Sequence, residues 1–369
     1  MPYIFVIIIG LIQAILAFAH LVVYKGVVAI WGVYRFFPLA FLRVVFVCLA
    51  VSFVISSIIA FRYYNLATSW FYTATAVWLG FLLYLFLAAV LYWLAVIVLN
   101  SVATPTALAW LGKFLVLAAI MAGVYGLIHN NQLAVTNIKV SLPSLPAEWS
   151  GKKAVWVSDI HLGQVYSVAF LDKIARQIKI IKPDIILVGG DVYDGAAFPV
   201  DSTIASLAKL RAPWGTYFIT GNHEEFGDNA KYLSVIKAAG FRILNNELIN
   251  VRGLQLLGVD YNATAKRDDF GKILSAWPLD KTKPSLLMKH APTDLDLAAQ
   301  HGISLQISGH THRAQLWPLS YITKLVYKGF DYGLHRWGQM AVYTSSGVGT
   351  WGPPLRVGSP SEIVLIEFE

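Results

Sequence analysis

The first 147 residues contain no aspartate or glutamate, which limits what this part of the chain can fold into. Four apolar stretches lie there, near residues 3–24, 38–61, 70–99 and 107–128. Each is long enough to cross the hydrocarbon core of a bilayer, which takes about 20 helical residues. The sequence therefore predicts an N-terminal bundle of about four transmembrane helices over residues 1–133.

The first stretch has a small-residue triplet, Ala17-Phe18-Ala19, of the kind cleaved from signal peptides. However, no basic residue precedes the apolar run, and the run continues to Val23. These features favour a retained helix over a cleaved signal peptide.

Ionisable residues inside a membrane segment are the usual sign of a transport pathway. Here the segments hold no carboxylate, and the basic residues fall near the predicted span ends, as do His20 and His129. The bundle is therefore interpreted as an anchor that makes the lipid bilayer a partner, rather than as a transporter.

The basic residues also predict an orientation. Lys25, Arg35 and Arg43 lie in or beside the first loop and Lys113 beside the third, whereas the second has only Arg62. Loops rich in Lys and Arg stay in the cytoplasm. We therefore expect a multi-pass protein of the cell (inner) membrane with its C-terminal domain on the extracytoplasmic face.

From residue 134 to residue 369 the pattern changes to short apolar strands that alternate with helices, which predicts an α/β domain. Strands are expected at 134–140, 154–157, 185–188, 216–219, 241–244, 248–251, 254–258, 285–288 and 304–307, and helices at 167–181, 200–210, 228–239 and 294–300. After residue 147 the chain has 23 basic and 21 acidic residues, without the basic excess of a nucleic-acid-binding protein.

Five of the predicted strands are followed within three residues by Asp, Asn or His side chains. Ligands of α/β sheets bind beyond these carboxyl ends. Taken singly, each residue has an ordinary explanation, since Asp191 could cap a helix and a lone His is usually a hydrogen-bonded surface residue. Together, carboxylate, amide and imidazole donors predict a site for Mn²⁺, Fe or Zn²⁺.

The donor residues form five ordered motifs, and over residues 150–369 the chain resembles the calcineurin-like metallophosphoesterases. The motifs are Asp159-x-His161, Gly190-Asp191-x-x-Asp194, Gly221-Asn222-His223-Glu224, Lys289-His290 and Gly309-His310-x-His312. The tail from Tyr343 to Arg356 is similar to that of the bacterial membrane-associated branch described as similar to UDP-diacylglucosamine hydrolase.

The resemblance implies two packed mixed β-sheets flanked by helices, and a pair of divalent metal ions. It implies that one ion is held by Asp159, His161, Asp191 and His312, and the other by Asp191, Asn222, His290 and His310, with Asp191 as the bridge. His223 would protonate the leaving oxygen. Asp194 would orient His223, or it would stabilise a turn before Gly195.

The implied reaction is hydrolysis of a phosphodiester or pyrophosphate, by in-line attack of a metal-bridging hydroxide. The predicted anchor favours a lipid or cell-envelope substrate. A non-catalytic receptor or assembly protein that uses the fold as a binding module is the alternative, and it would be expected to have lost some of the donor residues.

Residues 315–330 carry apolar side chains at helical spacing, with Lys324 and Lys328 on another face. The apolar residues are Leu316, Leu319, Ile322, Val326 and Phe330. The pattern fits a helix packed on the domain's own core, and it equally fits an interfacial helix that lies in the lipid headgroups beside the active site.

Overall fold

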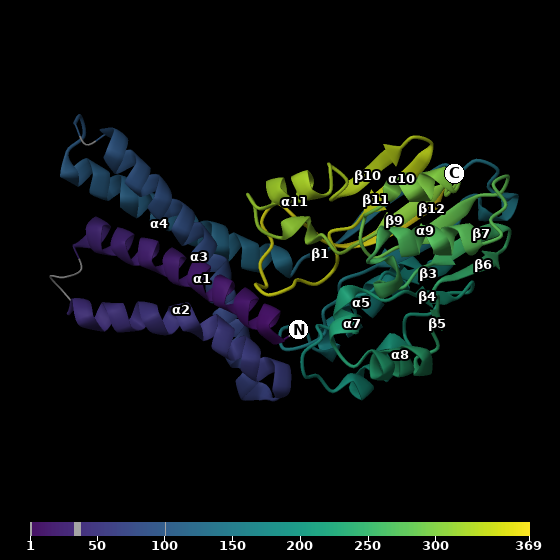
Figure 1. Cartoon of the computed structure of the whole chain (residues 1–369), viewed down its shortest axis with the longest axis horizontal. Coiled ribbons are helices and arrows are strands. Elements are labelled where there is room, and N and C mark those ends of the chain that lie inside the picture. The colour runs from purple at the N-terminus through teal and green to yellow at the C-terminus, as the bar shows by residue number, and fades with distance from the viewer. Residues whose placement is uncertain (1, 33–37, 100) are drawn as a thin grey trace. The chain divides into compact units, whose positions relative to one another are not determined.

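A computed structural model describes residues 2–32, 38–99 and 101–369 (Figure 1). The described chain divides into two compact units. One holds the N-terminal helices together with the short segment Gly352–Val357, and the other holds the remaining residues from His129 onward.

The N-terminal unit contains four long helices, as expected. They are α1 (Pro2–Trp31), α2 (Leu39–Arg62), α3 (Leu66–Leu99) and α4 (Pro105–Asn130). All four are long and apolar enough to cross a membrane. The predicted end of the first helix at residue 24 is wrong, because the helix continues through Lys25 to Trp31. Arg35, used above to predict orientation, lies outside the described residues.

The longer first helix also changes the place of His20, which was expected near a helix end. Its side chain is buried within the bundle. The Nδ1 atom lies 2.7 Å from the Leu16 carbonyl oxygen, and the indole N–H of Trp78 donates to Nε2 over 2.9 Å. With Nε2 accepting and Nδ1–H donating, the imidazole is neutral and joins α1 to α3.

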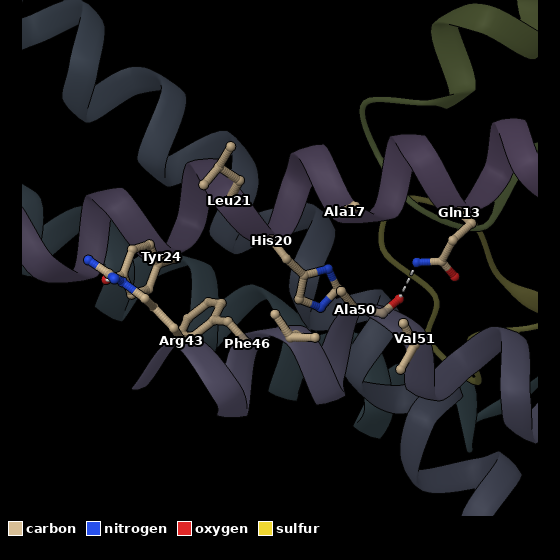
Figure 2. Close-up of a pocket in the computed structure, with 10 residues that line it drawn as sticks. Gln13, Ala17, His20, Leu21, Tyr24, Arg43, Phe46, Ala50 and Val51 are labelled. Atoms are coloured by element: carbon tan, nitrogen blue, oxygen red, sulfur yellow. Dashed lines mark hydrogen bonds between the residues drawn. The ribbon is translucent and has the colours of Figure 1, made fainter. Parts of the chain in front are cut away.

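A cavity of about 370 Å³ lies between α1 and α2. Figure 2 shows Tyr24 and Arg43 at one end of it, Gln13 at the other and His20 between them. The Arg43 guanidinium donates to the Tyr24 hydroxyl over 3.3 Å, and the Gln13 amide donates to the Ala50 carbonyl. Its walls are otherwise apolar.

The segment Gly352–Val357 packs among α3 and α4, although it is distant from them in sequence. A Cβ atom added at Gly80 would lie 2.8 Å from Cδ1 of Leu355. The backbone N–H of Arg356 donates to the carbonyl of Gly126 over 3.0 Å. The small residues of these two helices therefore leave room for a segment from the C-terminal part of the chain.

The second unit is built on two six-stranded sheets. The first has the order β1 (Leu133–Val140), β12 (Ser361–Phe368), β2 (Lys153–Val157), β3 (Ile185–Val188), β4 (Thr216–Phe218) and β5 (Arg242–Ile243). The second has the order β10 (Gly333–Trp337), β11 (Met340–Thr344), β9 (Leu305–Ser308), β8 (Ser285–Met288), β7 (Leu254–Gly258) and β6 (Glu247–Val251). The pairs β12–β2, β10–β11 and β6–β7 are antiparallel and the others parallel.

The two sheets pack face to face through buried side chains such as Trp156 and Leu187 from the first and Leu256 and Ile307 from the second. Helices α5 (Val168–Ile181) and α8 (Asn229–Ala238) cover the outer face of the first sheet. Helices α9 (Arg267–Ala276) and α10 (Leu295–Gln300) cover that of the second. The predicted fold of two packed mixed sheets flanked by helices is confirmed.

Local differences from the predicted elements are small. The helix expected at 200–210 is a 3₁₀ turn, Val200–Thr203, followed by the single turn α6 (Ile204–Leu207). Helix α9 and strands β10, β11 and β12 were not predicted. The helix expected over 315–330 is only α11 (Ser320–Val326), which follows a cis peptide bond between Trp317 and Pro318.

Candidate metal centre

The donor residues lie on five loops at the carboxyl ends of parallel strands. Asp159 and His161 follow β2 and Asp191 follows β3. Asn222 and His223 begin the short helix α7 (Asn222–Phe226) after β4. His290 follows β8, and His310 and His312 follow β9. The first three strands belong to one sheet and the last two to the other.

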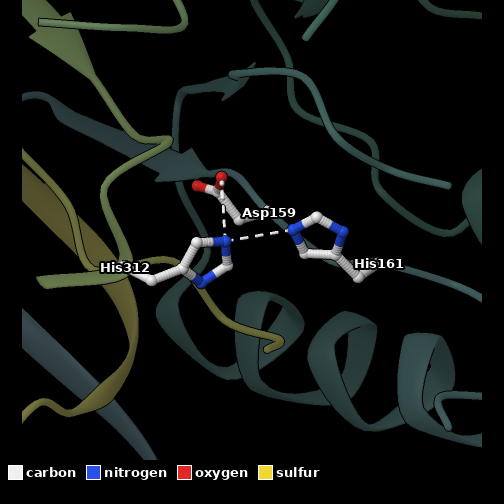
Figure 3. Close-up of side chains that lie close together, drawn as sticks. All are labelled: Asp159, His161 and His312. Atoms are coloured by element: carbon white, nitrogen blue, oxygen red, sulfur yellow. Dashed lines mark hydrogen bonds and ion pairs between the residues drawn. The ribbon is translucent and has the colours of Figure 1, made fainter. Parts of the chain in front are cut away.

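One group of donors consists of Asp159, His161 and His312, whose ligand atoms all lie within 4.8 Å of one another. Nε2 of His312 is 3.6 Å from Oδ1 of Asp159 and 3.1 Å from Nε2 of His161. Figure 3 shows the three side chains and marks these two interactions with dashed lines. All three side chains are buried.

A second group consists of Asp191, His290 and His310. Nε2 of His290 is 3.2 Å from Oδ2 of Asp191 and 3.2 Å from Nδ1 of His310. The amide oxygen of Asn222 is also 3.2 Å from Nε2 of His290, so the fourth predicted donor is in place.

Asp191 lies between the two groups. Its Oδ1 atom accepts the backbone N–H of His223 over 2.9 Å. Its Oδ2 atom is 3.8 Å from Nε2 of His161 in the first group and 3.2 Å from Nε2 of His290 in the second. One oxygen is thus held by the backbone while the other faces both groups.

These residues fit a pair of divalent cations. In each group, two imidazole nitrogens approach to 3.1 or 3.2 Å and point at one another, together with a carboxylate. Carboxylate and amide oxygens with imidazole nitrogens are the donor mixture of Mn²⁺, Fe and Zn²⁺ sites.

Charges inside the second group act in opposite directions on its two imidazoles. Burial alone would lower the pKa of His290, but the carboxylates of Asp191 and Asp159 outweigh it and raise the pKa to about 9. Burial and the neighbouring His290 lower the pKa of His310 to about 3. The two carboxylates therefore favour the charged form of the His290 ring, whereas burial and the neighbouring His290 favour the neutral form of the His310 ring.

The backbone of the centre is unusual. Five of the seven predicted metal ligands have a φ between 48° and 69°, a region that residues with a side chain rarely adopt. They are Asp159, His161, Asp191, His310 and His312. Such conformations cost on the order of 1–3 kcal/mol each and persist only where the surrounding structure enforces them.

His223 and Asp194 lie beside the first group. Nδ1 of His223 is 2.9 Å from the backbone carbonyl oxygen of Asp194 and 3.7 Å from its carboxylate. The same carboxylate is closer to Nδ1 of His161, at 3.3 Å. Asp194 therefore contacts both imidazoles, and its nearest contact with His223 is made by the main chain.

Glu224 is a site residue whose role the sequence did not reveal. It is fully buried, and its two oxygens accept four backbone N–H groups. The donors are Asp191 and Gly221 to Oε2, at 2.7 and 2.8 Å, and Val192 and Tyr193 to Oε1, at 2.8 and 3.2 Å. Glu224 thus ties the loop after β3 to the turn before α7. In the sequence, its position three residues after Gly221, which is typical of a capping box, could have indicated this role.

Gly221 shows how closely these loops approach. A Cβ atom at this position would lie 2.1 Å from Oδ1 of Asp191. Any side chain at residue 221 would therefore displace the carboxylate that faces both donor groups.

The tail singled out in the sequence packs against the first motif. The backbone N–H groups of Val348 and Gly349 donate to the carbonyls of Ser158 and Asp159, over 3.1 and 2.8 Å. The buried carboxylate of Glu362 accepts the Ser345 hydroxyl and the Ser346 N–H, each over 3.0 Å, and so fixes the start of the tail. The tail therefore supports the loop that carries Asp159.

Lys289, which precedes a predicted ligand, does not join the donor groups. Its ammonium group hydrogen-bonds to the Thr293 hydroxyl, lies 3.8 Å from Asp294, and is 5.1 Å from the centre of the Phe270 ring. Burial lowers its pKa to about 8.

Comparison with known proteins agrees with this geometry. The family model described as calcineurin-like phosphoesterase matches residues 152–314. An uncharacterized metallophosphoesterase of Helicobacter pylori strain J99 is 34% identical over 222 residues, covering 58% of this chain and 59% of its own length. One from Aquifex aeolicus is 30% identical over 258 residues, covering 68% of this chain and 97% of its own length.

A relative whose name contains the word transmembrane is also found. The bovine transmembrane protein with metallophosphoesterase domain is 31% identical over 272 residues, covering 68% of this chain and 61% of its own length. The chain thus matches about three fifths of the length of the Helicobacter and bovine relatives. The likeness to UDP-diacylglucosamine hydrolase stays a prediction.

Proposed function

Because this chain belongs to the calcineurin-like metallophosphoesterases, we propose that it is a membrane-anchored enzyme that hydrolyses a phosphodiester or pyrophosphate of a lipid or cell-envelope substrate. In this proposal residues 1–133 are the anchor and residues 134–369 the catalytic domain. The observation that carries it is Asp191 Oδ2, which faces imidazoles of both donor groups.

Seven side chains would hold the metal pair. Asp159, His161, Asp191 and His312 would hold one ion, and Asp191, Asn222, His290 and His310 the other. Two divalent cations at such a centre supply Lewis acidity and lower the pKa of bound water. The donor set suits Mn²⁺, Zn²⁺ or Fe equally.

His223 is proposed as the proton donor to the leaving oxygen. Its Nδ1 atom faces the Asp194 carbonyl over 2.9 Å, which fixes the ring and leaves Nε2 for the substrate. The contact between the Asp194 carbonyl oxygen and Nδ1 of His223 supports the role of Asp194 in positioning His223. The Asp194 carboxylate would position His161 in the same way.

Metal removal tests the proposal directly. The full-length protein, purified in detergent and treated with a chelator, is expected to lose hydrolysis of bis(p-nitrophenyl) phosphate and to regain it with added Mn²⁺ or Zn²⁺. A panel of phosphodiesters, pyrophosphates and phosphomonoesters would then rank the substrate classes. Undiminished hydrolysis by protein shown to be metal-free by elemental analysis would contradict the proposal.

We also propose that the catalytic domain faces outward from the cell (inner) membrane, since Lys25, Arg43 and Lys113 outnumber Arg62 on the opposite side of the bundle. An envelope phospholipid or lipid-linked phosphate suits this orientation better than a nucleotide-linked precursor made in the cytoplasm. Protease added to intact spheroplasts is expected to cleave the domain. Protection until the membrane is broken would reverse the placement.

A further inference from the structure

Helix α11 carries apolar side chains that the catalytic unit leaves in solvent. Ile322, Leu325 and Val326 are 58%, 81% and 65% exposed, and Trp317 and Tyr321 beside them are also exposed. Contiguous exposed apolar surface of this kind marks a place where something binds, because each Å² left in water costs about 25 cal/mol.

The exposed side chains are not those that the domain uses for its own core. In the segment 315–330, Leu316 is buried and Phe330 packs partly against the core beneath the second sheet. Both lie outside the single helix α11. The expected stripe from Leu316 to Phe330 is therefore not one helix face, and packing on the domain's own core does not account for Ile322 and Val326.

Helix α11 is fixed to the metal centre. The ring of Tyr327, the next residue after the helix, lies 6.5 Å from that of His310. The Thr311 hydroxyl donates to the Asp331 carbonyl over 2.6 Å, and the Thr323 hydroxyl on α11 donates to the Asp331 carboxylate over 3.1 Å. The exposed face thus leads through Tyr327 to a predicted metal ligand.

The surroundings of the centre are aromatic. The largely exposed rings of Phe226 and Trp351 lie 5.8 and 6.1 Å from that of His223. Tyr261 lies 5.8 Å from His290 and 6.0 Å from His310. In the described part of the chain, the carboxylates of Asp159, Asp191 and Asp194 form ion pairs with imidazoles. The aromatic rings beside them offer surface that suits an apolar substituent.

We propose that the exposed face of α11 inserts into the headgroup region of the bilayer that holds α1–α4. The metal centre then takes an amphiphilic phosphoester whose apolar arm lies along α11 and Tyr327. This inference rests on the proposed function and adds to it the route by which substrate arrives.

Three features favour a bilayer over a protein as the occupant. The chain carries four membrane-length helices, so a bilayer is always within reach. Only two residues separate the end of α4 at Asn130 from the start of β1 at Leu133, which tethers the catalytic unit closely. Residues 315–330 contain no acidic residue, and the exposed Lys324 and Lys328 suit anionic headgroups.

A kinetic test compares two diesters with the same leaving group, p-nitrophenyl methyl phosphate and p-nitrophenyl hexadecyl phosphate. Full-length protein is used in nanodiscs of phosphatidylethanolamine and phosphatidylglycerol. The triple variant Ile322→Ser, Leu325→Ser, Val326→Ser is expected to lose about tenfold in kcat/KM for the hexadecyl ester, since burial of the apolar arm is lost. The methyl ester should be hydrolysed at the wild-type rate.

Ile180→Ser is the matched control, because Ile180 lies on α5 and is 73% exposed. It should leave both esters unaffected. Equal effects of the triple variant on both esters would contradict the route along α11.

A second measurement locates the helix without relying on hydrolysis. In a Cys48→Ser background, which removes the single cysteine, a nitroxide is attached at Leu325→Cys or at Ile180→Cys. Position 325 is expected to be accessible to oxygen and protected from a water-soluble nickel complex, as in lipid, and position 180 the reverse. Access of the nickel complex to position 325 would exclude bilayer insertion. Protection of position 325 from both oxygen and the nickel complex would also contradict the proposal, because it would indicate that a protein covers α11.

The two proposals can fail separately. If the wild-type protein shows no metal-dependent hydrolysis of the methyl ester, the proposed function is wrong. The nitroxide measurement would still report on the position of α11.

Discussion

Asp191→Asn is expected to reduce kcat/KM for p-nitrophenyl methyl phosphate about a thousandfold, the scale reached when one preorganised electrostatic contact is removed. The amide oxygen of Asn would keep the bond to the His223 N–H, which now goes to Oδ1. The amide nitrogen would then replace Oδ2, the atom that faces His161 and His290. A neutral amide N–H₂ group would thus replace the anionic oxygen that faces both groups of metal-binding side chains.

The measurement pairs steady-state kinetics with the metal content of the purified protein, and at most one ion per chain is expected in the variant. Asp172→Asn is the matched control, because that carboxylate pairs on the surface with Lys209 and contacts no donor residue. Wild-type activity and wild-type metal content in Asp191→Asn would contradict the two-metal mechanism.

Glu224→Ala is expected to lower the free energy of unfolding by roughly 4 kcal/mol or more. Four buried backbone N–H groups would lose their acceptor, and each unsatisfied group costs about 1–3 kcal/mol unless water enters. Because two of those donors are Asp191 and Gly221, metal binding should weaken as well.

Glu224→Gln separates shape from hydrogen bonding, since it keeps the size of the side chain but offers only one acceptor oxygen. It should recover little of the loss, because its amide N–H₂ would face two backbone donors. Glu225→Gln is the neighbouring control, as Glu225 is partly exposed and accepts from the side chains of Asn229 and Asn262. Thermal unfolding followed by tryptophan fluorescence in detergent measures the stability of the Glu224 and Glu225 variants. A Glu224→Gln protein as stable as wild type would show that the four bonds do not hold these loops.

The fold class was accessible from the sequence because local pattern carries it. Long apolar runs without carboxylates can form little other than membrane helices, and short apolar strands that end in polar turns indicate an α/β sheet. Strands β10, β11 and β12 were not predicted; they follow the last motif, and no Asp, Asn or His motif marks their ends. The length of the first helix was underestimated, because a single basic residue such as Lys25 does not end a helix.

Part of the candidate centre was predictable for the same reason, because carboxyl ends of parallel strands in one sheet lie at the same edge. That the donors after β8 and β9 of the second sheet join those after β2, β3 and β4 was decided by the packing of the two sheets. No local sequence pattern indicates toward which partner each ligand atom points. That Asp191 uses Oδ1 for the His223 N–H and Oδ2 for both donor groups depends on the approach of Gly221, a contact between loops 30 residues apart.

By itself, then, the sequence determined four apolar helices, an α/β domain and the identity of the donor side chains, because these depend on composition and on the order of residues. The tertiary structure alone decided that Glu224 binds four backbone N–H groups, that Gly352–Val357 packs among the helices, and that α11 leaves Ile322, Leu325 and Val326 uncovered. Burial and hydrogen-bond partners are set by segments distant in the chain, and no residue's own neighbours in sequence specify them.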